Sequence, residues 1–183
     1  MHRFFCHPNI INNKEIEVFD KAVLHHIKDV LRLKAGETAI LVDETGTEYC
    51  AELSKVDSAK AIFAIVRKQQ ANKKKRVSVT IACALPKKSK IDDIIDKLTQ
   101  LGVDRVIPLV SERVIVKLDK KSAASRLERW KKIAVSASQQ SQRNTVPVIT
   151  PVTDLKDLIA QSHEFDFKLI PHLAGERKPL KEL

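Results

Sequence analysis

The chain has 183 residues, of which 43% are hydrophobic, so it is long enough for one globular domain or two small ones. Its three cysteines match no zinc-site spacing, its four glycines allow no glycine-rich phosphate loop, and no apolar run approaches the roughly 20 residues that span a bilayer. The net charge is +10 and the start of the chain lacks a signal-peptide core, so we expect a basic cytoplasmic protein that binds neither metal nor membrane.

Short strands and one small helix are predicted for residues 1–70. Asp20 can cap a helix whose apolar residues are Val23, Leu24, Ile27 and Val30. Strands are predicted at 38–42, 47–53 and 61–66. The sequence Asp43–Gly46, between the first two strands, is typical of a hairpin turn. This succession predicts a compact β-barrel.

The basic run Lys73–Arg76 lies in the predicted linker, residues 71–76, because the hydrophobic pattern changes after it. Val77–Leu85 is a nearly continuous apolar run, typical of a strand buried on both faces. Ser89 can cap the next helix, with Asp92 as its capping-box partner. The apolar stripe of that helix is Ile91, Ile94, Ile95, Leu98 and Leu101, and Gly102 ends it.

Strands and helices alternate through residues 77–183. A strand is predicted at Arg105–Val110, and a long helix begins at Ser122. The inner residues of that helix are expected to be Leu127, Trp130, Ala134 and Ala137. The remaining elements are a short strand at 146–149, a helix from Thr153 or Asp154 to Ile159, and a buried strand at 165–170. This alternation predicts an α/β domain with a parallel sheet.

The excess positive charge lies in one part of the chain. Residues 71–150 hold 18 Lys and Arg against 7 Asp and Glu, whereas residues 1–70 hold ten of each kind and residues 151–183 hold 5 against 6. Such a block favours a nucleic-acid partner, because its phosphates release counterions when cations bind them. The alternative is a solvated surface that only improves solubility.

Several polar clusters in this block are candidates for contact with a ligand. Lys87, Lys88 and Lys90 follow one predicted strand, and Ser111-Glu112-Arg113 follows the next, where α/β sheets gather ligands. Gln139, Gln140, Arg143 and Asn144 end the long helix, on which Arg126, Arg129 and Lys132 can form one basic face. We expect all these positive residues on a single edge of the sheet.

Each of these clusters also has a purely structural interpretation. Ser111-Glu112-Arg113 can be a self-satisfied polar turn, and Arg143 can either bind phosphate with two hydrogen bonds or cap helix carbonyls. Trp130 falls on the apolar stripe, so we expect it in the core rather than as a platform for base stacking. The chain has only 4% aromatic residues, so exposed rings are not its main means of binding RNA.

These clusters belong to a set of short stretches that occur in one order along nearly the whole chain. They are Arg3-Phe4-Phe5, His26-Ile27, Val30-Leu31-Arg32-Leu33, Ala84-Leu85-Pro86-Lys87, Lys97–Val103, Pro108–Arg113, Val116–Asp119, Arg129–Ala134 and Gln140–Asn144 with Pro147. In these stretches the chain resembles the RsmE family of 16S ribosomal RNA uridine-N3 methyltransferases, which belong to the SPOUT class.

The resemblance implies a small PUA-like β-barrel at residues 1–70 and a parallel-sheet SPOUT domain, of the α/β knot type, at residues 77–183. It implies S-adenosylmethionine as cofactor, a homodimer, and 16S ribosomal RNA or the small ribosomal subunit as partner. Arg113 and Arg143 would be catalytic, by favouring the uracil anion, and no general base can be named. On the same likeness Arg3, Arg32 and Asn144 would face RNA or the active site. The basic clusters described above add Lys87, Lys88, Lys90, Arg126, Arg129 and Lys132 as expected RNA contacts.

The chain also departs from the family's pattern. Gln100 stands where the family usually has glutamate, and Gln142 where it usually has glycine. The family continues with a Gly-Pro-Glu-Gly-Gly loop and a later Arg-Ile-Leu-Arg segment that form the knot and most of the cofactor pocket, and this chain has neither. Pro171, His172 and Leu173 would supply at most one wall of that pocket. We therefore expect a C-terminally incomplete domain that binds the cofactor poorly and is inactive alone.

Two other functions fit the same residues. A non-catalytic RNA-binding module would keep the basic block without the chemistry. A flavodoxin-like nucleotide binder would share the α/β pattern, but the scarcity of glycine counts against it.

Overall fold

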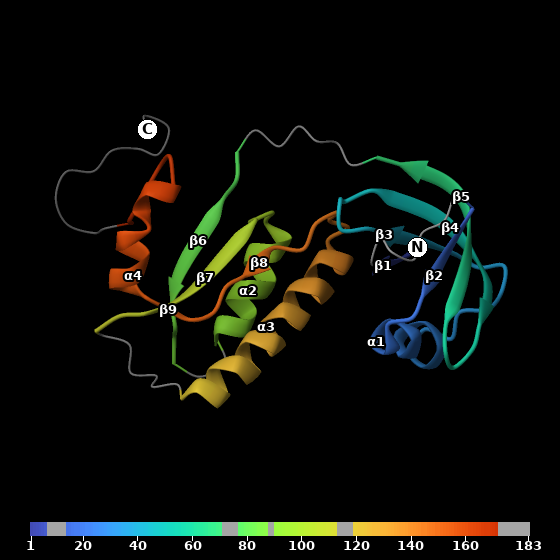
Figure 1. Cartoon of the computed structure of the whole chain (residues 1–183), viewed down its shortest axis with the longest axis horizontal. Coiled ribbons are helices and arrows are strands. Elements are labelled where there is room, and N and C mark those ends of the chain that lie inside the picture. The colour runs from blue at the N-terminus through green and yellow to red at the C-terminus, as the bar shows by residue number, and fades with distance from the viewer. Residues whose placement is uncertain (7–13, 71–76, 88–89, 113–118, 172–183) are drawn as a thin grey trace.

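The computed structural model describes residues 1–6, 14–70, 77–87, 90–112 and 119–171. The chain forms two units, each with its own sheet and its own hydrophobic core (Figure 1). We call them the N-terminal unit (β1 to β5 with α1 and η2) and the C-terminal unit (β6 to β9 with α2, α3, α4 and η3). The predicted linker at residues 71–76 lies outside the described residues.

The N-terminal unit is a five-stranded sheet that forms a half-barrel. Its strands are β1 (His2–Phe5), β2 (Glu15–Val18), β3 (Thr38–Val42), β4 (Glu48–Val56) and β5 (Ala61–Gln69). They lie in the order β1-β3-β4-β5-β2, and only β1 and β3 pair in parallel. Two register shifts between β4 and β5 bend the sheet around a core that includes Phe4, Leu53 and Phe63.

One helical segment closes the open side of this core. It consists of α1 (Lys21–His25) and the π-helix η2 (His26–Val30). Asp20 caps it as predicted, because its Oδ1 accepts hydrogen bonds from the N–H groups of Ala22 and Val23 at 2.8 and 3.0 Å. Val30 was expected on the apolar face but is 59% exposed. The wider turn of the π-helix rotates it away from the core.

The C-terminal unit contains the predicted parallel sheet. Its strands are β6 (Thr80–Ala84), β7 (Arg105–Val110), β8 (Val148–Ile149) and β9 (Thr153–Asp154). All pairings are parallel, and β8 and β9 pair with successive parts of β7. The helices are α2 (Lys90–Gln100), α3 (Lys120–Gln140) and α4 (Leu155–Ala160), followed by the 3-10 turn η3 (Ser162–Glu164).

Helices α2 and α3 pack together under the sheet. Ile95, Trp130 and Ala134 are all fully buried there, so the predicted core position of Trp130 is confirmed. Asp92 joins the two helices: its Oδ1 accepts from Trp130 Nε1 at 3.1 Å, and its Oδ2 pairs with Arg129 at 2.6 Å. Asp92 was predicted to close a capping box with Ser89, which lies outside the described residues.

Two predicted elements of this unit, the first strand and the long helix, differ in the structure. Strand β6 begins at Thr80 and is not buried on both faces, since Ala82 and Ala84 are exposed. The cause is that β6 is an edge strand, with α2 and α3 on one side of the sheet. Helix α3 begins at Lys120, two residues before Ser122, because Asp119 is its cap and accepts from the Ser122 N–H at 2.7 Å.

The apolar run at 165–170 is not a strand in the described structure. Phe167, Leu169 and Ile170 are 79%, 58% and 86% exposed, and the run pairs with no described strand. An apolar run forms a strand only where a neighbour offers hydrogen bonds.

Leu101, expected in the stripe of α2, is 81% exposed, because α2 ends at Gln100 and the chain turns at Gly102 with φ of +96°.

None of the described helices is both long enough and apolar enough to cross a membrane.

Candidate nucleic-acid interface

The carboxyl edge of the sheet carries the polar residues that follow β6 and β7. Lys87, Lys90 and Glu112 are exposed there and Ser111 is half-buried. Lys88 and Arg113, predicted for the same edge, lie outside the described residues. The four described side chains therefore stand at one edge, as two consecutive parallel strands require.

Helix α3 carries the longest row of positive side chains. It has 21 residues and is about 31 Å long at 1.5 Å per residue. Arg129 and Lys132 are exposed and Arg126 is half-buried. Arg129 is also paired with Asp92, so a phosphate would have to compete with that carboxylate for it. Lys131 donates to Glu128 at 2.8 Å, and this hydrogen bond lowers the pKa of Glu128.

Arg143 and Asn144 lie at the opposite edge of the sheet, so the prediction of a single basic edge is wrong. Val148 of β8 pairs with Arg105, the first residue of β7, which places the segment before β8 at the amino edge. A helix that connects parallel strands runs back antiparallel to them. Helix α3 therefore starts at the carboxyl edge and delivers its C-terminus to the amino edge, beside the N-terminal unit (Figure 1).

Arg3 joins the two units at this place, which we call the seam. Its Nη2 pairs with Glu48 Oε1 at 2.8 Å within the N-terminal unit. Its Nη1 donates across the seam to Asn144 Oδ1 at 3.1 Å and to the Arg143 carbonyl oxygen at 3.3 Å. The Arg3 side chain is only 7% exposed. Arg3 and Asn144, both predicted to face RNA, are thus hydrogen-bonded to each other.

The Arg143 guanidinium is used inside the C-terminal unit. Its Nη1 donates to the carbonyl oxygens of Thr99 at 2.7 Å and Val103 at 2.9 Å, at the end of α2. Burial lowers the pKa of the Arg143 guanidinium, and Asp104 partly opposes this effect. These contacts correspond to the capping alternative, although the helix that Arg143 caps is α2 and not its own.

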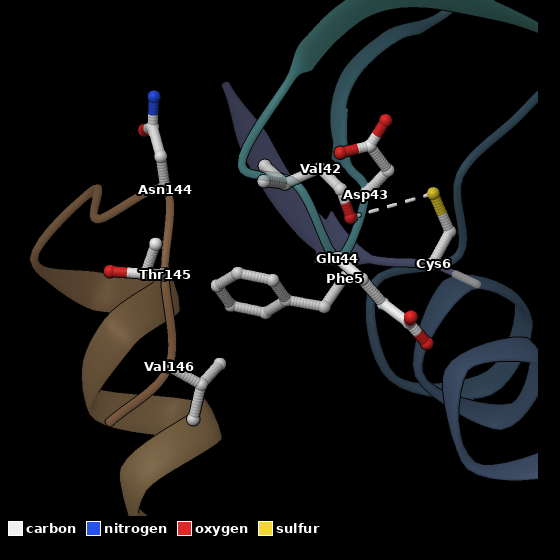
Figure 2. Close-up of a pocket in the computed structure, with 8 residues that line it drawn as sticks. All are labelled: Phe5, Cys6, Val42, Asp43, Glu44, Asn144, Thr145 and Val146. Atoms are coloured by element: carbon white, nitrogen blue, oxygen red, sulfur yellow. Dashed lines mark hydrogen bonds between the residues drawn. The ribbon is translucent and has the colours of Figure 1, made fainter. Parts of the chain in front are cut away.

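A pocket of about 340 Å³ opens at the seam (Figure 2). Its lining comes from β1 and the β3–β4 turn on one side and from the segment after α3 on the other: Phe5, Cys6, Val42, Asp43, Glu44, Asn144, Thr145 and Val146. The Phe5 ring reaches between the two units toward Val146 (Figure 2). Burial, and then Asp43, raise the pKa of the Cys6 thiol to about 12, so this thiol is not a nucleophile at neutral pH.

The other predicted residues stand apart from the seam. Arg32 is exposed and adopts φ of +53°, a left-handed conformation that is uncommon for a residue other than glycine. Pro171 is exposed, and His172 and Leu173 lie outside the described residues. Within the described ranges, no group of three or more His, Cys, Asp or Glu side chains could hold a metal ion.

Sequence reasoning missed Glu48 and Phe5 as residues of the seam. Glu48 is opposite Val42 in the β3–β4 pairing, and Val42 is opposite Phe5 in the β1–β3 pairing. No local pattern signals that neighbourhood, because it depends on the register of three strands. The only available signal was Arg3 itself, an arginine directly before two phenylalanines in a short strand.

Comparisons with known proteins agree with this architecture. A family model described as RNA methyltransferase domain matches residues 73–183, and one described as RNA methyltransferase PUA domain matches residues 19–66. The chain is 37% identical over 143 residues to the Ribosomal RNA small subunit methyltransferase E of Bacillus subtilis, covering 78% of this chain and 56% of that protein. It is 33% identical to the protein of that name from Mesomycoplasma hyopneumoniae, covering 93% of this chain and 70% of the relative.

A solved structure gives the same result. The chain superimposes on the structure of the Ribosomal RNA small subunit methyltransferase E from Neisseria gonorrhoeae bound to S-adenosyl methionine, with a TM-score of 0.77 and 29% sequence identity. The superposition covers 87% of this chain and 65% of the Neisseria chain. The chain thus spans little more than half the length of the Bacillus relative, and 42% of the length of a Synechocystis relative with the same name.

Proposed function

The chain belongs to the RNA methyltransferase family, and on that premise we propose that it binds 16S ribosomal RNA and serves the S-adenosylmethionine-dependent methylation of uridine N3. The observation that carries this proposal is the match of the family model to residues 73–183, the part of the chain that holds the excess positive charge. A PUA model on residues 19–66 adds a second RNA-associated unit.

The proposed RNA contacts lie on three surfaces. Helix α3 offers Arg126, Arg129 and Lys132, and the carboxyl edge offers Lys87 and Lys90. Arg32 offers an exposed guanidinium on the N-terminal unit. Lys88 and Arg113 are proposed for the carboxyl edge from the sequence alone. Contacts to phosphates fix the position of the RNA and carry no base specificity.

The methyl donor is proposed because the Neisseria relative is bound to it. When bound, S-adenosylmethionine would supply the methyl group. Pro171, the one described residue of the expected pocket wall, is exposed, and the pocket of the seam lies at the amino edge, between the units.

The part of the chemistry that this chain's residues could perform is electrostatic. Methyl transfer to N3 requires loss of the ring proton, and a nearby cation favours the uracil anion that results. We propose Arg113 or Arg143 for this role. Two backbone carbonyls orient the Arg143 guanidinium, so its charge is held in one place.

The RNA-binding proposal is tested by filter binding of a 16S ribosomal RNA fragment at increasing salt. The affinity should fall steeply with salt, because bound phosphates release counterions. The double variant Arg129→Gln, Lys132→Gln should reduce the slope of log K against log salt by about 1.5, at roughly 0.7 to 0.9 per phosphate contact.

The matched control is Lys55→Gln, Lys97→Gln, which removes two exposed charges outside the proposed surfaces, each paired with a neighbouring carboxylate as Arg129 is. This control should leave the slope unchanged. Equal slopes for the two double variants would exclude α3 from the RNA contact.

The catalytic proposal is tested by transfer of labelled methyl to the same RNA, with calorimetry for the cofactor. Methylation of uridine N3 by the chain supports it. Tight RNA binding without methyl transfer would instead favour the non-catalytic RNA-binding module. Micromolar cofactor binding by this chain alone would refute the expectation that it binds the cofactor poorly.

A further inference from the structure

We propose that Arg3 is a positioning residue: it fixes the angle between the two units, so that their RNA-binding surfaces act as one, and it does not itself contact RNA. This inference rests on the proposed function only where its test measures RNA binding. Its structural basis is the hydrogen-bond network that Arg3 forms on both sides of the seam.

The accessibility of Arg3 argues against a direct phosphate contact. Its side chain is 7% exposed, while Glu48 is 20% exposed. Nη2 is directed to Glu48 in its own unit and Nη1 to Asn144 and the Arg143 carbonyl in the other. A phosphate could take this guanidinium only by displacing the Glu48 carboxylate and opening the seam.

The Arg3 guanidinium can instead fix the orientation of the two units relative to each other. A largely buried ion pair contributes little net stability compared with apolar side chains of the same volume, but it can specify one arrangement over others. The chain passes once between the units, from Gln69 at the end of β5 to Thr80 at the start of β6. A single covalent connection does not set an angle, so the contacts of the seam must do so.

The relative orientation matters because the proposed RNA contacts are divided between the units. Arg32 is in the N-terminal unit, and Arg129 and Lys132 are in the C-terminal unit. When two sites are held at a fixed spacing, the second contact forms at a high effective concentration. Loosening the seam would lower affinity without removing any phosphate contact.

Glu48→Gln separates this role from direct RNA binding. Removing a negative charge should strengthen RNA binding by electrostatics alone. If Arg3 positions the units, the variant should bind the 16S fragment about five- to tenfold more weakly, the effect of losing a charge-assisted hydrogen bond. The slope of log K against log salt should stay unchanged, because the phosphate contacts are the same.

The matched control is Glu52→Gln, an exposed glutamate on the same strand. It removes the same charge away from the seam and should bind RNA as tightly as the original chain or more tightly. An affinity of Glu48→Gln equal to that of Glu52→Gln would overturn the proposal. A salt slope for Arg3→Gln that is reduced by about 0.7 to 0.9 would also overturn it, because it would show that Arg3 itself neutralises a phosphate.

X-ray scattering of the free chain provides a readout that does not require RNA binding. Glu48→Gln and Asn144→Ala, which weaken the seam from its two sides, should both broaden the distribution of interatomic distances, and Glu52→Gln should not. Near-ultraviolet circular dichroism of Tyr49 and Trp130 verifies that each unit is folded. Unchanged scattering in both seam variants would refute the positioning role even if no RNA bound, whereas absence of RNA binding with changed scattering would refute only the proposed function.

Discussion

Asp43 shows how one buried carboxylate organises a turn. It is 7% exposed and its side chain accepts hydrogen bonds from the Thr45 N–H and Oγ1, the Thr47 N–H and the Tyr49 hydroxyl. Burial alone would raise the pKa of Asp43, but these donors outweigh it and hold the pKa below its ordinary value. The β3–β4 turn, which borders the pocket of the seam, therefore depends on a charged group.

Asp43→Asn should destabilise the N-terminal unit by about 1–3 kcal/mol at neutral pH, because an amide has one acceptor oxygen fewer and turns a donor toward donors. A lowered folded-state pKa means that the contribution is complete above about pH 5 and is lost as the pH falls below about 4. Urea unfolding of both proteins between pH 7 and pH 3 measures this. The two curves should converge in acid, and a constant difference would contradict the assignment.

The contacts of single residues were harder to predict from the sequence than the elements or the fold. The sequence indicated Arg3, Arg143 and Asn144 as important, yet their partners are set by long-range contacts that no local pattern contains. Gln142 is a position where the family pattern is informative. It adopts φ of +57°, a conformation that favours glycine, and glycine is what the resembled family usually has there.

Elements were more predictable, because their signals are local. The Asp20 cap, the Gly102 turn, the Asp43–Gly46 hairpin and the parallel pairing of β6 with β7 were all predicted and are present. The apolar run at 165–170 was not predictable in the same way, because periodicity alone cannot show whether a partner strand exists. Arg143 lies at the amino edge, and not at the predicted carboxyl edge, because α3 runs antiparallel to the strands that it connects.

The N-terminus of α3 offers a test at this scale. Asp119→Ala should lower the urea midpoint of the C-terminal unit, since it leaves the Ser122 N–H without its 2.7 Å acceptor. Asp119→Ser keeps a capping oxygen and should retain most of the stability. Urea unfolding followed by Trp130 fluorescence measures both. Equal losses for Ala and Ser would mean that the cap does not stabilise α3.

At the scale of the whole molecule, the chain has two separate cores with one natural reporter in each. Trp130 is the only tryptophan and lies in the C-terminal core, and Tyr49 is the only tyrosine and lies in the N-terminal core. Leu53 and Ile95 are fully buried members of the first and second core. This division allows the two units to be destabilised and observed one at a time.

Leu53→Ala and Ile95→Ala should each destabilise their own unit by about 2–5 kcal/mol. In chemical denaturation followed by Trp130 fluorescence, Ile95→Ala should lower the transition midpoint strongly and Leu53→Ala only slightly, because the units share little more than the seam. Tyr49 circular dichroism should give the reverse order. Equal midpoint shifts at both reporters would show that the molecule unfolds as a single cooperative unit.

Helix α3 gives the molecule a mechanical property. It is an unbroken rod of 21 residues that runs from the carboxyl edge of the sheet to the amino edge, where it contacts β1. A rod of this kind transmits displacement with little bending over its length of about 31 Å. A partner that shifted the first turn of α3 would therefore also shift Arg143 and Asn144, to which Arg3 of the N-terminal unit is hydrogen-bonded.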